Sequence, residues 1–93
     1  KSDPRHTARL VDLAQFRERI RQIEDANRAD QQRIFDTYRK YPASDPASRA
    51  SVSREVGAIQ VQMVRRNEDR RKLREAIAKL EADVGLAPTE GAK

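Results

Sequence analysis

The 93-residue sequence contains no cysteine and only one histidine, His6, near its start. The absence of cysteine excludes a disulfide framework, a thiolate nucleophile and a cysteine-based zinc site. A single histidine in a segment expected to fray is a poor candidate for a serine or cysteine triad. The glycines are scattered at Gly57, Gly85 and Gly91, so no glycine-rich phosphate loop is present. We therefore predict a non-catalytic protein that uses no cofactor and no metal.

Aromatic residues and long apolar runs are equally scarce. There is no Trp, and the aromatic side chains are two Phe and two Tyr. No apolar run approaches the roughly 18 residues of a membrane span, so no membrane insertion is expected. Hydrophobic residues make up 37% of the chain and charged residues 38%. Such a balance is typical of long exposed helices that bury a narrow seam rather than a thick core.

Proline and glycine divide the chain into two long segments. Residues 8–40 contain neither, and most of them favour helix. Pro42 and Pro46 break the pattern, and Asp45-Pro46 is a typical helix start. We predict a flexible lead-in over residues 1–7, helix one over 8–41, a turn over 42–45, helix two over 46–84 and a flexible tail over 85–93. No strand pattern occurs, so the fold class is all-α.

Both predicted helices carry apolar residues at alternating spacings of three and four. This heptad spacing predicts an antiparallel helical hairpin of the coiled-coil type. Its seam positions are Leu13, Phe16, Ile20, Ile23, Asn27, Asp30, Ile34, Thr37 and Tyr41 in helix one, and Val52, Val56, Ile59, Met63, Arg66, Arg70, Leu73, Ile77, Leu80 and Val84 in helix two.

The middle of each stripe is polar, and the interruptions match. An antiparallel arrangement sets Asn27 and Asp30 opposite Arg66 and Arg70, with Asn27 meeting Arg66. The same register places Arg17 beside Glu81 and Lys40 beside Glu55. Unpaired buried charges are costly, so this register is preferred to one slipped by a heptad. The layer is interpreted as a register lock, and a dimer contact or ligand site built on these residues is the alternative.

Several apolar residues lie off the seam and widen it. They are Leu10, Ala14, Val61, Val64 and Ala78. A lone hairpin would leave them exposed, whereas a second hairpin would cover them. We therefore expect a homodimer that forms a four-helix bundle.

The function expected from these features is that of an assembly or adaptor module. It would bind an unidentified protein partner through the heptad seam and the hairpin tip. The candidate partner-binding residues are Tyr38, Tyr41, Arg66, Arg70, Arg71 and Arg74. Two alternatives stay open. The net charge of +5 and the arginines of residues 65–74 fit nucleic-acid binding, and a start at Lys1 rather than Met fits a sensory or signalling module cut from a membrane receptor.

Overall fold

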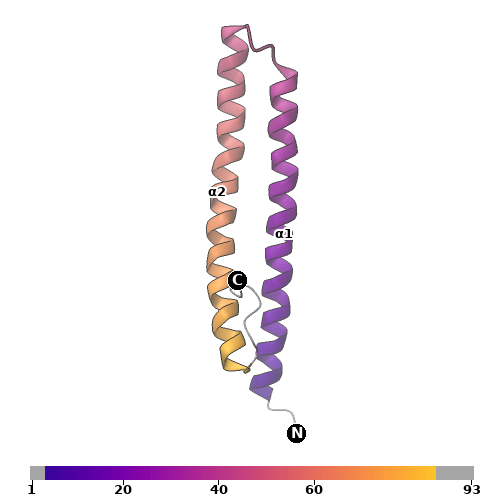
Figure 1. The fold of residues 1–93 in the computed structure, drawn as a ribbon, viewed down its shortest axis with the longest axis vertical. Helices are drawn as coiled ribbons and strands as arrows, with labels where there is room; N and C mark the ends of the chain where they lie inside the picture. The colour runs from indigo at the N-terminus through magenta and orange to yellow at the C-terminus, as the bar shows by residue number, and fades with distance from the viewer. Residues whose placement is uncertain (1–3, 86–93) are drawn as a thin grey trace. The chain divides into compact units, whose positions relative to one another are not determined.

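The computed structural model describes residues 4–85, which form two long helices. Helix α1 spans Pro4–Lys40 and helix α2 spans Pro46–Asp83. The chain reverses between them, and the helices pack against each other (Figure 1). No strand occurs among the described residues. The predicted all-α helical hairpin is confirmed.

The start of α1 differs from the expected boundary. The helix begins at Pro4, so residues 4–7 are helical rather than part of the lead-in. Proline suits the first helical position because its fixed φ is already helical and its missing N–H is not needed there. The other residues expected in the lead-in, 1–3, and residues 86–93 of the expected tail lie outside the described residues.

The turn begins where proline disfavours helix. α1 ends at Lys40, because Tyr41 precedes Pro42 and is pushed out of the helical region. The backbone N–H of Asp45 donates to the carbonyl of Pro42 at 3.4 Å, which closes a tight turn.

Asp45 caps the start of α2. The backbone N–H of Ala47 donates to its Oδ1 at 3.3 Å, and the Ser48 hydroxyl donates to its Oδ2 at 2.9 Å. A carboxylate at this position satisfies an amide that the helix itself leaves without an acceptor. The Asp-Pro start signal thus acts as the sequence suggested.

α2 ends one residue before the expected boundary at residue 84. The helix ends at Asp83, and Gly85 has a φ of 75°. Its N–H donates to the carbonyl of Ala82 at 3.2 Å. A left-handed residue of this kind terminates many helices, and glycine adopts it without a Cβ clash. Gly85, expected in the tail, is therefore the residue that closes the helix.

The hairpin divides into two units, each with a stretch of both helices. Unit 1 holds Lys1–Gln22 and Glu68–Lys93, and unit 2 holds Ile23–Asn67. In unit 1, Leu13 and Ile20 of α1 are buried with Ile77 of α2. In unit 2, Ile34 of α1 is buried with Val56 and Ile59 of α2. All six were predicted as seam residues.

Candidate functional site

A buried charge cluster lies in unit 2. Asp30 is only 4% exposed, although it carries a carboxylate. It accepts hydrogen bonds from Arg66 of α2 and, at 3.0 Å, from Arg33 one turn along α1. The hydrogen bond from Arg66 is the main cause that lowers the pKa of Asp30 below its ordinary value, and Arg33 adds to it, while burial acts in the opposite direction. The carboxylate is therefore held in its charged form between two guanidinium groups.

The polar layer differs in detail from the expected pairing. Asn27 was expected to meet Arg66, but its side-chain nitrogen donates to the Oδ1 of Asn67 at 3.0 Å. Arg66 instead takes the charged partner, because a buried guanidinium gains more from a carboxylate than from an amide. The Oδ1 of Asn27 is buried and has no hydrogen-bond partner within the described residues. Arg70 is half-buried in unit 1.

The end of unit 2 near the turn is held by a tyrosine–glutamate contact. The Tyr41 hydroxyl donates to the Oε2 of Glu55 at 2.6 Å. Lys40 approaches the other carboxylate oxygen at 3.7 Å and also lies 5.1 Å from the centre of the Tyr41 ring. The Tyr41 hydrogen bond is the largest cause that lowers the pKa of Glu55. Tyr41 is thus a structural link between the helices, and the Lys40–Glu55 pairing expected from the sequence is confirmed.

One side of unit 2 is nearly free of charge. We call this surface, formed by Phe35, Tyr38, Val52, Gly57, Gln60 and Val64, the uncharged side. A groove of about 450 Å³ runs along it, and Arg49 is the one charged residue among the ten that line the groove. Arg49 itself donates to the carbonyl of Ala43 at 3.0 Å, at the turn.

Large apolar side chains on the uncharged side are open to solvent. The exposed fractions are 54% for Phe35, 57% for Tyr38 and 67% for Val64. Phe35 and Tyr38 share a second hollow with Gln32 and Arg39, and Arg39 is paired with Asp36. Exposed apolar residues that gather on one side of a small protein often mark a contact surface.

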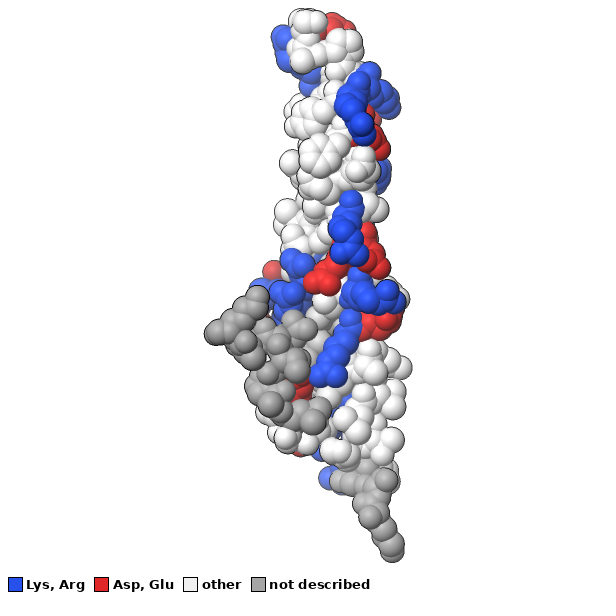
Figure 2. Space-filling view, turned by 45° about the vertical axis from the view of Figure 1, so that its right-hand side comes forward, with Lys and Arg blue, Asp and Glu red and all other residues white. Residues whose placement is uncertain are grey.

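The opposite side of unit 2 has a different character. A hollow of about 640 Å³ lies there, and four of the eight residues that line it are charged: Arg33, Asp36, Lys40 and Glu55. We call this surface the charged side. In the part of Figure 2 that holds unit 2, uncharged residues cover most of one side, with basic residues near its end, while basic and acidic residues line the other side. The two sides of the same helix pair therefore present distinct surfaces.

Most arginines whose contacts are described have an acidic neighbour, including Arg66 and Arg71 of α2. The guanidinium of Arg71 lies between Glu68 and Glu75, and Glu68 is the main cause that raises the pKa of Arg71. Arg66 forms an ion pair with Asp30. Arg74 is exposed. Of the arginines of residues 65–74, at least Arg66 and Arg71 thus carry their own counter-charges.

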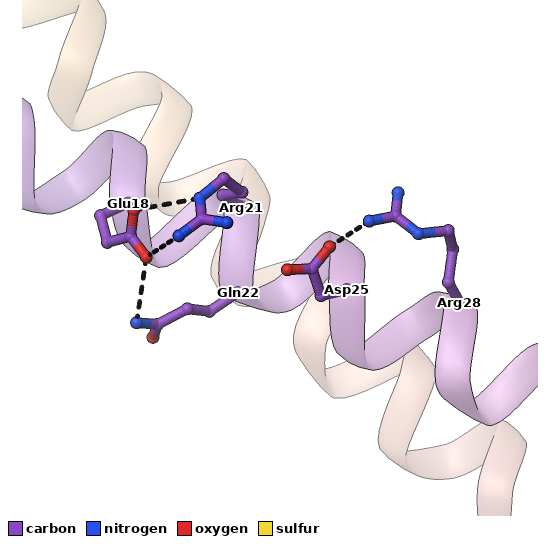
Figure 3. Close-up of polar contacts among 5 residues, drawn as sticks. All are labelled: Glu18, Arg21, Gln22, Asp25 and Arg28. Carbon is purple, nitrogen blue, oxygen red and sulfur yellow. Dashed lines mark hydrogen bonds and ion pairs between the residues drawn. The ribbon is translucent and has the colours of Figure 1, made fainter.

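The exposed arginines of α1 show the same local pairing (Figure 3). Arg21 donates twice to the carboxylate of Glu18, three residues earlier, and Gln22 donates to it as well. Arg28 pairs in the same way with Asp25. Contacts between residues three or four apart stabilise a solvated helix by a few tenths of a kcal/mol each. These charges are best explained as helix-supporting pairs.

Unit 1 holds the second buried carboxylate. Glu81 is 1% exposed and accepts a hydrogen bond from Arg17 at 2.7 Å. This pairing was expected from the sequence and is confirmed. The burial of Glu81 was not expected, because its place beside the seam indicated a solvated flank. The burial of Ser48 was not predicted either. Its place three residues after Asp45, to which its hydroxyl donates, is a helix-capping pattern that could have indicated this contact.

Metal-binding and membrane-spanning features are absent from the part of the chain that the structure describes. No three His, Asp or Glu side chains in it gather into a possible metal site. Neither helix has a stretch apolar enough to cross a bilayer. The recognisable surfaces are therefore the uncharged side, the charged side and the turn.

Comparison with known proteins gives no match. No protein-family model matches the sequence, and no curated protein or solved structure matches it either. Function must therefore be inferred from the residues of the chain alone.

Proposed function

We propose that this chain is a non-catalytic helical assembly module that binds another protein's helices through the uncharged side of unit 2 and the adjoining turn. The observation that carries the proposal is the exposure of Phe35, Tyr38 and Val64 on a surface almost without charge. Apolar side chains give affinity to helix-on-helix contacts, and flanking charges select the partner. Arg39 and Arg49, at the borders of the uncharged side, would supply those flanking charges.

The turn extends this surface. Tyr38 and Tyr41 line the groove together with Pro42, so the groove reaches the end of the helix pair. Tyr38 is the stronger anchor of the two, since 57% of it is exposed, whereas the Tyr41 hydroxyl is already bound to Glu55. Aromatic rings that insert into a partner's pocket often dominate binding energy.

Nucleic-acid binding remains the alternative, and the pairing of the arginines argues against it. A phosphate would have to displace Glu68 and Glu75 from Arg71, and Asp30 from Arg66. No aromatic side chain lies within residues 65–74 to stack on a base. The sensory-module hypothesis depends on sequence beyond this chain and stays a prediction.

Site-specific photocross-linking tests the proposal. A photoreactive phenylalanine analogue replaces Phe35 on the uncharged side, and the same analogue replaces Gln62 on the charged side as the matched control. In cells that make the protein, we expect protein adducts from position 35 and few from position 62. Adducts to nucleic acid, or equal labelling from both positions, would contradict the proposal.

A further inference from the structure

Gly57 lies in the middle of the uncharged side, inside an otherwise regular helix. Glycine is a much weaker helix former than alanine, so the fold of the hairpin alone does not favour it at this position. A Cβ built on Gly57 would meet nothing within 4 Å. The hairpin itself therefore does not need the missing side chain, and the open space faces the groove that Gly57 helps to line.

We propose that the partner on the uncharged side is a second copy of this chain, whose helix crosses α2 over Gly57. This inference rests on the proposed function and names its partner. Two hairpins joined in this way would present the same surface to each other about a two-fold axis, which is the commonest symmetry of protein dimers. Phe35, Tyr38 and Val64 of each copy would be covered.

Charge favours a second copy over a charged partner. A partner helix rich in acidic or basic residues would lose hydration against a surface whose charged lining residues are already engaged: Arg49 donates to Ala43, and Arg39 pairs with Asp36. The matching surface is one that is itself apolar and uncharged, and the chain carries such a surface. Contact across the charged side would instead strip water from the Lys40–Glu55 pair.

The size of the surface is adequate for a small dimer. The stretch of α1 in unit 2, residues 23–40, is about 27 Å long at 1.5 Å per residue, and two adjacent helices are about 20 Å wide. With the relief of the side chains, that face approaches the roughly 800 Å² per partner buried in standard protein interfaces. The burial of Phe35 and Val64 would add apolar area at its centre.

Single cysteines test the contact, because the natural chain has none. The variants Gln60→Cys and Gln62→Cys place an exposed thiol on the uncharged side and on the charged side, respectively. With a short bis-maleimide at micromolar protein, we expect a covalent dimer from Gln60→Cys and monomer from Gln62→Cys. Equal dimer from both variants, dimer from Gln62→Cys alone, or no dimer from either would overturn the inference.

A second pair of variants separates association from folding. Gly57→Leu fills open space in the single hairpin and removes a weak helix former, so its thermal midpoint at low concentration should rise. The same side chain should obstruct a second helix and weaken self-association by about tenfold or more. Ala58→Leu on the charged side is the control and should leave the dimerisation constant unchanged. Unaltered association in Gly57→Leu would overturn the crossing point at Gly57.

The two proposals fail differently. If position 35 labels another protein in cells while the purified chain stays monomeric, the assembly function stands and the second copy is wrong. If the purified chain dimerises through Gln60→Cys, the partner is identified directly. If position 35 labels nucleic acid and the purified chain forms no dimer, both the assembly function and the second-copy proposal are wrong.

Discussion

Asp30 and Arg66 form a buried ion pair that joins α1 to α2 inside unit 2. Their side chains are 6% and 28% exposed, so little water competes for the contact. Arg33 binds the other oxygen of the same carboxylate. Asp30 lies one helical turn before Ile34, which belongs to the apolar cluster with Val56 and Ile59.

Removal of Asp30 alone should be costly. Asp30→Ala leaves the partly buried guanidinium of Arg66 without its carboxylate partner. We therefore expect the free energy of unfolding to fall by about 3 kcal/mol. The measurement is urea denaturation followed by circular dichroism. Asp36→Ala, which removes an exposed carboxylate paired with Arg39, is the control and should change the unfolding free energy far less than Asp30→Ala.

The double variant should behave differently. Asp30→Leu with Arg66→Leu replaces the ion pair by two apolar side chains, so no charge is left without its partner. We expect the free energy of unfolding to stay unchanged or to rise by about 1 kcal/mol or more. The register of the helices should become less specific, which broadened amide signals in NMR spectra would reveal. A double variant as unstable as Asp30→Ala would show that the charges stabilise the fold itself.

Acid should weaken the protein through Asp30. Its folded pKa lies below the ordinary value, which is about 3.9 for an unfolded aspartate. The ionised carboxylate therefore adds stability above about pH 4, and that stability is lost as the pH falls through the lower folded pKa. The difference in unfolding free energy between wild type and Asp30→Asn should be largest near pH 6 and shrink below pH 4. A difference that is constant from pH 6 to pH 2 would contradict this assignment.

Loss of the hydroxyl should affect the protein at Tyr41 and have no effect at Tyr38. Tyr41→Phe removes the 2.6 Å hydrogen bond to Glu55, and we expect a loss of about 1 kcal/mol, because the pair is partly exposed. The pKa of Glu55 should rise toward its ordinary value, since that hydrogen bond is the main cause of its lowering. Tyr38→Phe, at a residue 57% exposed, should leave both quantities unchanged. NMR titration of the glutamate carboxyl carbons measures the pKa.

The core of unit 1 should depend on Ile77. This side chain has no exposed surface and packs with Leu13 and Ile20. Ile77→Ala should lower the free energy of unfolding by about 3 kcal/mol, through lost burial and the cavity that remains. Val11→Ala, at a residue 50% exposed on α1, should change it by less than about 0.5 kcal/mol. Equal effects in the two variants would show that the seam of unit 1 is placed wrongly.

Sequence periodicity was sufficient for the fold because a two-helix hairpin has one seam. The heptad positions of Leu13, Ile20, Ile34, Val56, Ile59 and Ile77 determined which residues are buried. The Asp45-Pro46 signal determined where α2 begins, since it depends only on local capping chemistry. The pairings Arg17–Glu81 and Lys40–Glu55 followed from the antiparallel register.

Details that depend on side-chain reach could not be predicted in the same way. Arg66 lies three residues from Met63, the register partner of Asp30, but its side chain is long enough to bind Asp30. Asn27 contacts Asn67 instead. The contrast between the uncharged and charged sides was not predicted from the sequence. It appears only when flanking positions of both helices, such as Tyr38 with Gln60 and Lys40 with Glu55, are considered together. Arg71 was predicted to bind a partner, but its counter-charges Glu68 and Glu75 lie within about one turn of the same helix.

The most direct test of the proposed assembly surface is the molar mass of the purified chain by sedimentation equilibrium, over a range of concentrations at 150 mM and 500 mM salt. Because the contact is proposed to be apolar and uncharged, we expect a dimer of twice the 10.7 kDa chain mass whose dissociation constant hardly changes with salt. The variant Tyr38→Glu should shift the equilibrium to monomer. A wild-type mass of 10.7 kDa at every concentration, or a dimer that dissociates at high salt and ignores Tyr38→Glu, would contradict the account.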